Sequence, residues 1–206
     1  MSEQELIEYI EQNLENSPMI DTETGISAVK KLSEIAEREN VEWALAGGIA
    51  MHLYGSPRLT KDVDVISMKR LSLESIRPIG FGGESYEVVV GKKKIHVDWI
   101  VREDNYRQYY VQALKDATTL KNGLRVITAE WLAILKYIAG RDKDLDDIVY
   151  LLRKNGYVKR GVIKQNIVKT KSEDVWFAML PNWQRLFDLA DTKIQGRDKY
   201  YRDPMR

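Results

Sequence analysis

A pair of glycines, Gly47 and Gly48, ends a short apolar stretch at residues 43–46. A strand that runs into a turn is the simplest structure for this stretch, and residues 49–54 are then expected to form a short helix. Glycines at such a turn let the backbone approach a ligand closely, and the first N–H groups of the next helix can bind an anion. The segment predicts a turn suited to a triphosphate, although most Gly-Gly pairs are plain turns.

Two carboxylates, Asp62 and Asp64, follow this turn in a segment whose residues 63–66 are expected to form a strand. Side chains two positions apart on a strand point to the same face. Two unpaired carboxylates on one face repel each other, and a divalent cation removes that cost. The pair therefore indicates a metal site, with a solvated strand edge or a turn as the alternative.

A third acid, Asp98, lies in the middle of an apolar segment, where a charged group is unexpected in a core. Residues 86–90 and 94–100 are rich in β-branched and aromatic residues and have Gly91 between them, which predicts a hairpin. Asp98 either faces solvent or lies beside the first acidic pair on a neighbouring strand. Both interpretations give the same side-chain alternation, so the alternation does not choose between them.

The spacing of apolar residues predicts the other elements of the chain. The expected helices are at residues 6–14, 26–35, 131–138, 145–152 and beyond 162, with a loop at 80–83 and a strand at 124–127. The change of element type near Ile127 divides the chain into N-terminal helices at 1–40, a core at 41–127 and a C-terminal helical region at 128–206.

The order of these motifs resembles the nucleotidyltransferase (polymerase-beta-like) superfamily. The matching features are the Gly-Gly pair, the short helix, Gly55-x-x-Arg58, Thr60-x-Asp62-x-Asp64 and an Asp on a later strand. Downstream, the segments Leu135-Lys136, Ala139-Gly140-Arg141 and Lys143-Asp144-Leu145-Asp146-Asp147-Ile148 are similar to the K…R/K-D-x-x-D helix segment of AbiEii-type toxin nucleotidyltransferases. The resemblance covers roughly residues 41–152.

The resemblance implies an α+β fold, in which a small mixed β-sheet core is flanked by helices and followed by a C-terminal helical part. It also implies transfer of a nucleoside monophosphate from an NTP to an acceptor hydroxyl, with Mg²⁺ as the cofactor and Mn²⁺ as its alternative. Asp62, Asp64 and Asp98 would be the catalytic and metal-binding residues, and the nucleotide-binding residues would be Gly47, Gly48, Arg58, Lys61, Lys136 and Lys143.

Each of the basic residues also has a simpler interpretation. Arg58 and Lys61 flank the carboxylates and would balance their charge. Lys136 lies among apolar residues at helical spacing, so its stem would lie along the core while its ammonium group reaches water. Asp144 and Asp147 are expected to pair with Arg141 and Lys143, as a salt-bridged start of a helix or as a rim of the nucleotide site.

Composition excludes several other functions. The net charge of +1 gives no general attraction to nucleic acid or membrane, and the absence of cysteine excludes disulfides and thiolate metal sites. Two histidines make a histidine-rich zinc site unexpected, and no apolar run is long enough to cross a bilayer, so a cytoplasmic protein is expected.

The resemblance and the basic stretches at residues 92–94 and in the C-terminal tail favour RNA or protein as the acceptor over a small drug. A cognate antitoxin would be a further partner if the chain is the toxin of a toxin–antitoxin pair. The alternative is a nucleotidyltransferase-fold protein that has lost turnover and acts as a binding or regulatory partner.

Overall fold

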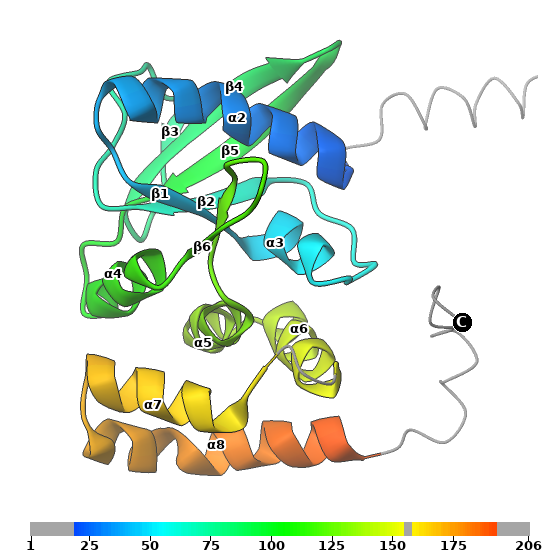
Figure 1. Ribbon diagram of the computed structural model, residues 1–206, viewed down its shortest axis with the longest axis vertical. Helices are drawn as coiled ribbons and strands as arrows, with labels where there is room; N and C mark the ends of the chain where they lie inside the picture. Colours follow the sequence, from blue (N-terminus) through cyan, green and yellow to red (C-terminus); the bar gives the residue numbers. More distant parts are fainter. Residues whose placement is uncertain (1–18, 155–157, 193–206) are drawn as a thin grey trace, which may run out of the picture.

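The computed structural model describes residues 19–154 and 158–192 and shows one mixed β-sheet with helices around it (Figure 1). The strands are β1 Trp43–Ala46, β2 Val63–Ser67, β3 Arg77–Pro78, β4 Gly83–Val90, β5 Lys93–Ile100, β6 Thr118–Thr119 and β7 Arg125–Val126. The helices are α2 Thr22–Arg38, α3 Gly47–Leu53, α4 Arg107–Lys115, α5 Ala129–Ala139, α6 Asp142–Arg153, α7 Arg160–Thr170 and α8 Glu173–Asp191. The α+β class is confirmed, and the helix expected at residues 6–14 lies outside the described residues.

The seven strands follow the order β3-β4-β5-β2-β1-β7-β6. β4 and β5 form the expected antiparallel hairpin. β5 then pairs in parallel with β2, and β2 pairs with β1 in the antiparallel sense. The central strands β5, β2 and β1 therefore bring together three segments that carry the acidic and glycine motifs.

Helices cover the sheet on both sides. α2 packs against β1, β2, β4 and β5, whereas α4 packs against β2 and lies with α5 on the other side of the sheet (Figure 1). α5 contacts α6 and α7, and α8 packs on α6 and α7 as the outermost helix of the C-terminal region. None of the helices in the described residues is long and apolar enough to cross a membrane.

Local sequence explains where the principal helices begin and end. Asp21 caps α2 by accepting from the Thr24 backbone N–H at 2.7 Å. Thr128 caps α5 through the Trp131 N–H at 3.4 Å, which confirms the expected N-cap. Gly140 ends α5 in a left-handed conformation with φ of 65°, a backbone geometry that glycine adopts without strain. These caps fix where α2 begins and where α5 begins and ends.

Candidate functional site

The parallel pairing of β2 and β5 places Asp64 directly beside Asp98. Neighbouring residues in register on paired strands project their side chains to the same face of the sheet. Asp62 precedes β2 by one residue and lies two positions before Asp64, so it extends the row at the strand's start. The structure therefore brings together the three acids that the sequence singled out.

The environment of Asp64 is unfavourable for its negative charge. Burial, together with the charges of Asp62 and Asp98, raises the pKa of Asp64 to about 6, against opposing effects of Lys136 and the Gly48 N–H. A cation bound beside Asp64 would offset the unfavourable charge of its carboxylate. The electrostatics agree with the geometry that Asp64 lies close to both Asp62 and Asp98.

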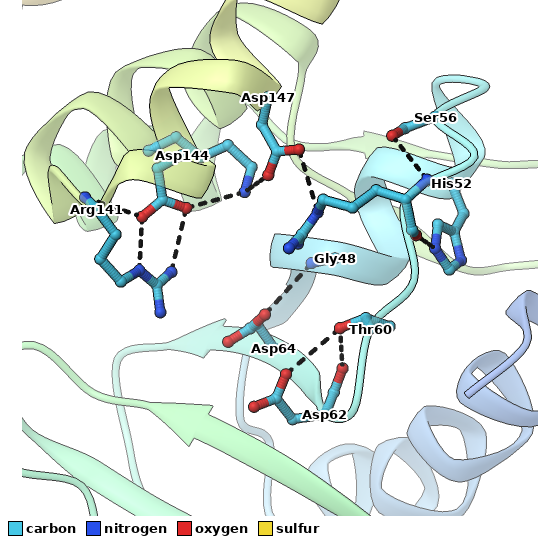
Figure 2. Close-up of polar contacts among 11 residues, drawn as sticks. Gly48, His52, Ser56, Thr60, Asp62, Asp64, Arg141, Asp144 and Asp147 are labelled. Atoms are coloured by element: carbon cyan, nitrogen blue, oxygen red, sulfur yellow. Dashed lines mark hydrogen bonds and ion pairs between the residues drawn. The ribbon is translucent and has the colours of Figure 1, made fainter. Parts of the chain in front are cut away.

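The glycine turn packs against this cluster. Gly47 has a φ of 57°, and a Cβ at its position would lie 1.7 Å from Asp64 Oδ2. The Gly48 backbone N–H donates to the same carboxylate oxygen at 3.3 Å, and a Cβ on Gly48 would lie 2.4 Å from Thr60 Oγ1 (Figure 2). Both glycines are therefore required by the neighbouring side chains Asp64 and Thr60, whether or not a ligand is bound. α3 begins at Gly47, two residues earlier than expected.

Arg58 lies between the glycine turn and α6. Its Nε forms an ion pair with Asp147 Oδ1 at 3.1 Å, and its Nη2 is 3.3 Å from the position that a Gly48 Cβ would take. His52 donates from Nε2 to the Arg58 carbonyl oxygen, which ties this loop to α3. The guanidinium group is thus held next to the turn, and its Nη atoms bind no other residue in the described part of the chain.

Lys136 is the centre of a buried ion-pair network. Its side chain comes from α5 and is 5% exposed, with Nζ 3.2 Å from Asp144 Oδ1 and 2.6 Å from Asp147 Oδ2. Arg141 binds the other side of Asp144, with 2.6 Å between Nε and Oδ2 (Figure 2). Burial acts to raise the pKa of Asp144, but the hydrogen bond from Arg141 and the charge of Lys136 hold it below the usual value.

This network corrects the expected pairing of Asp147. Asp147 binds Arg58 and Lys136 instead of Lys143, because it points from α6 into the buried space between α5 and the loop after α3. The expected pairing of Asp144 with Arg141 is confirmed. Lys143 and Lys61 are exposed and form no hydrogen bond or ion pair with the described residues.

The acids on the sheet also influence the pKa of Arg141. Its hydrogen bond to Asp144 is the main cause that raises its pKa, and the charges of Asp64 and Asp62 contribute. The carboxylates on the sheet therefore face the ion-pair network of the C-terminal helices, in which Arg141 is the cation that their charges influence. Figure 2 shows Asp62 and Asp64 below the glycine turn, with Arg141 and Asp144 on the helices above.

The donor atoms fit a divalent cation in part. Asp98 Oδ1 is buried and has no hydrogen-bond partner, and Asp64 carries the unfavourable charge described above. As the side chains stand, no three histidine or acidic groups within residues 19–154 and 158–192 are close enough together to hold one ion. The arrangement thus offers Asp64 and Asp98 as a pair of oxygen ligands, with Asp62 at the border of the site.

Three residues at the site escaped the sequence argument. Ser85 lies opposite Asp98 on β4, fully buried, and its Oγ has no partner. Tyr110 from α4 also lies near the site, and Arg102, which follows β5, packs against its ring. Strand register was the only signal for Ser85, Tyr110 depends on a helix that the apolar spacing did not predict, and Arg102 lies outside every predicted element.

Comparisons with known proteins give a structural likeness only. No protein-family model matches the sequence, and no curated protein matches it. The structure is similar to the crystal structure of an antigenic nucleotidyltransferase-like protein from Paracoccidioides brasiliensis, with a TM-score of 0.45 and 17% sequence identity. The match covers 89% of this chain and 100% of that chain. No family is assigned to the chain by these comparisons.

Proposed function

We propose that this protein is a metal-dependent nucleotidyltransferase, which transfers a nucleoside monophosphate from an NTP to an acceptor hydroxyl. The observation that carries the proposal is the side-by-side placement of Asp64 and Asp98, with the pKa of Asp64 raised to about 6. Carboxylates held together in this way favour a divalent cation, which is the group that nucleotide phosphates require.

Mg²⁺, with Mn²⁺ as the alternative, would be held by Asp64 and Asp98 with Asp62 beside them, and would neutralise charge on the phosphates and polarise the acceptor oxygen. Arg58 supplies Nη donors next to Gly48, where they suit phosphate oxygens. Asp98 has a free, buried carboxylate oxygen that is suited to accept the proton of the acceptor hydroxyl. A new bond would form between the acceptor oxygen and the α-phosphorus, while the bond from the α-phosphorus to the oxygen that bridges to the β-phosphate breaks, so that pyrophosphate leaves.

Lys136, Lys61 and Lys143 have different roles in this proposal. Lys136 holds Asp144 and Asp147 in position, and Asp147 in turn holds Arg58, so Lys136 acts on the phosphate side of the site through its partners. Direct contact of Lys136, Lys61 or Lys143 with phosphate stays a prediction, as do a toxin role and an antitoxin partner. The exposed lysines would need a bound nucleotide that reaches the rim of the site.

The test is incubation of the purified protein with each α-³²P-labelled NTP, Mg²⁺ and total cell extract, followed by protease or ribonuclease. We expect label in a macromolecule with the wild-type protein and with Asp146→Asn, an exposed neighbour in α6. Asp64→Asn should lose the transfer, because it removes one charge of the acidic pair. Equal labelling by wild type and Asp64→Asn, or no labelling with any NTP, contradicts the proposal.

A further inference from the structure

Three aromatic rings surround the guanidinium group of Arg102. The Arg102 Cζ atom lies 4.7 Å from the ring centroid of Phe81 and 5.4 Å from those of Tyr106 and Tyr110. We call these four residues the Arg102 cluster. Arg102, Tyr106 and Tyr110 come from the segment after β5 and from the start and body of α4, and the fold adds Phe81 from the segment before β4.

Glycines hold the Phe81 side of the cluster in place. Gly82 has a φ of 113° and Gly83 has a φ of 101°, a region that other residues rarely adopt. A Cβ on Gly82 would lie 2.2 Å from the Val101 carbonyl oxygen, so only glycine lets this segment cross so close to the end of β5. Phe81 is therefore presented on a backbone that packs tightly against the strand that carries Asp98.

Asp104 fixes the other side of the cluster. Its Oδ1 accepts from Arg102 Nε at 2.9 Å and from the backbone N–H of Tyr106 at 3.0 Å. The charge of Arg102 is thus countered within the cluster, and its side chain is only 12% exposed. The guanidinium acts as a fixed planar support for the rings, since such a group stacks on aromatic faces.

One member of the cluster, Tyr110, lies near the acidic site. Burial raises the pKa of Tyr110 to about 12; the charge of Arg102 opposes this rise, and the charge of Asp64 adds to it. Tyr110 thus links the cluster to the acids, and its helix α4 packs on β2. Arg58 and the glycine turn are on the side of α3, whereas α4 is at the opposite end of the same side of the sheet (Figure 1). The acids have cations on one flank and aromatic rings on the other.

Two of the rings are open to solvent. Phe81 is 46% exposed and Tyr106 is 41% exposed, although each has Arg102 against one face. Each ring therefore keeps much of its surface open to a flat ligand.

We propose that the Arg102 cluster binds an unpaired nucleobase of a single-stranded nucleic-acid acceptor, by stacking on Phe81 and Tyr106. The inference rests on the proposed function, because the cations on the α3 side are assigned to the donor triphosphate. An acceptor then approaches the acids from the α4 flank. Nucleobases stack on aromatic rings and arginine with little dependence on sequence, which suits the flat, mixed chemistry of this cluster.

The test measures binding of a short, fluorescein-labelled single-stranded RNA without nucleotide, so that no turnover is needed. Phe81→Leu keeps the apolar character but removes the planar ring, and Phe177→Leu, at an exposed position of α8 that is 58% exposed, is the matched control. We expect Phe81→Leu to weaken RNA binding by a factor of roughly 5 to 100, as loss of one stacked base predicts. Phe81→Trp should retain binding, and thermal melting should show that all variants fold.

A separate titration with MgATP distinguishes the acceptor's base from the donor's base. We expect Phe81→Leu to bind MgATP as the wild type does. Loss of MgATP affinity with unchanged RNA binding would assign the rings to the donor and overturn the inference, as would no RNA binding by the wild type or an equal loss in Phe177→Leu. If RNA binding depends on Phe81 but no labelled NTP is ever transferred, the nucleobase surface stands and the transferase proposal fails.

Discussion

Asp64 shows how a single side chain links stability to function. Its folded-state pKa of about 6 lies above the ordinary value of 3.8, so its charged form is favoured in the unfolded chain. The free energy of unfolding is then highest, for this group, at pH below about 4, and it falls as the pH rises towards about 6. Above that pH the unfavourable charge is fully present unless a cation binds.

We therefore predict that Asp64→Asn stabilises the metal-free protein at neutral pH. The gain should be roughly 1–3 kcal/mol at pH 7.5 and should vanish near pH 4, because two pKa units correspond to at most about 3 kcal/mol. Urea unfolding at both pH values, in the presence of a chelator, measures it. A variant that is less stable than the wild type at pH 7.5 would show that the folded protein does not disfavour the charged form of Asp64.

Ser85 allows a second test at the residue scale. Its hydroxyl is buried beside Asp98 without a partner, whereas Ser67 is equally buried on β2 and donates to the Glu42 carbonyl oxygen at 2.7 Å. Ser85→Ala should leave the free energy of unfolding unchanged or higher, while Ser67→Ala should lower it by about 1–2 kcal/mol. Denaturant titration compares the two, and a similar loss in both would mean that the Ser85 hydroxyl has a partner in solution.

At the scale of elements, α5 and α6 are joined to the loop after α3 by the network of Lys136, Asp144, Asp147 and Arg58. Asp147→Asn leaves Arg58 and the buried Lys136 beside a neutral amide. The free energy of unfolding should therefore fall by about 3–5 kcal/mol. Asp146→Asn, one residue earlier and exposed, should change stability by less than about 0.5 kcal/mol. Thermal melting of both variants measures this, and equal melting temperatures would contradict a structural role for the network.

The elements that the sequence predicted well have strong local signals. The hairpin of β4 and β5 has β-branched strands around Gly91, and α5 has an N-cap at Thr128, so both appear where expected. α4 was not predicted, because it has only nine residues and four buried positions, too few for a clear apolar repeat. The two-residue strands β3 and β6 depend on pairing with β4 and β7, which no local pattern contains.

At the scale of the whole molecule, the site depends on long-range pairing. The motifs predicted that Asp62, Asp64 and Asp98 would converge, and the parallel register of β2 with β5 brings Asp64 and Asp98 together. The sequence did not predict that Gly47 would pack against Asp64, that Asp147 would bind Arg58, or that Arg102 would gather three rings. Apart from the local contacts of Arg102 with Tyr106 and Tyr110, these contacts join segments far apart in the chain, so they follow from the tertiary arrangement.

The most direct test of the metal site is an electron paramagnetic resonance titration of Mn²⁺ without nucleotide, which separates protein-bound from free metal. The wild type and Asp146→Asn should bind Mn²⁺ alike. Asp98→Asn should weaken the binding by at least about tenfold, because even second-shell changes cost that much. Equal Mn²⁺ binding by Asp98→Asn and the wild type would contradict a metal site on Asp64 and Asp98.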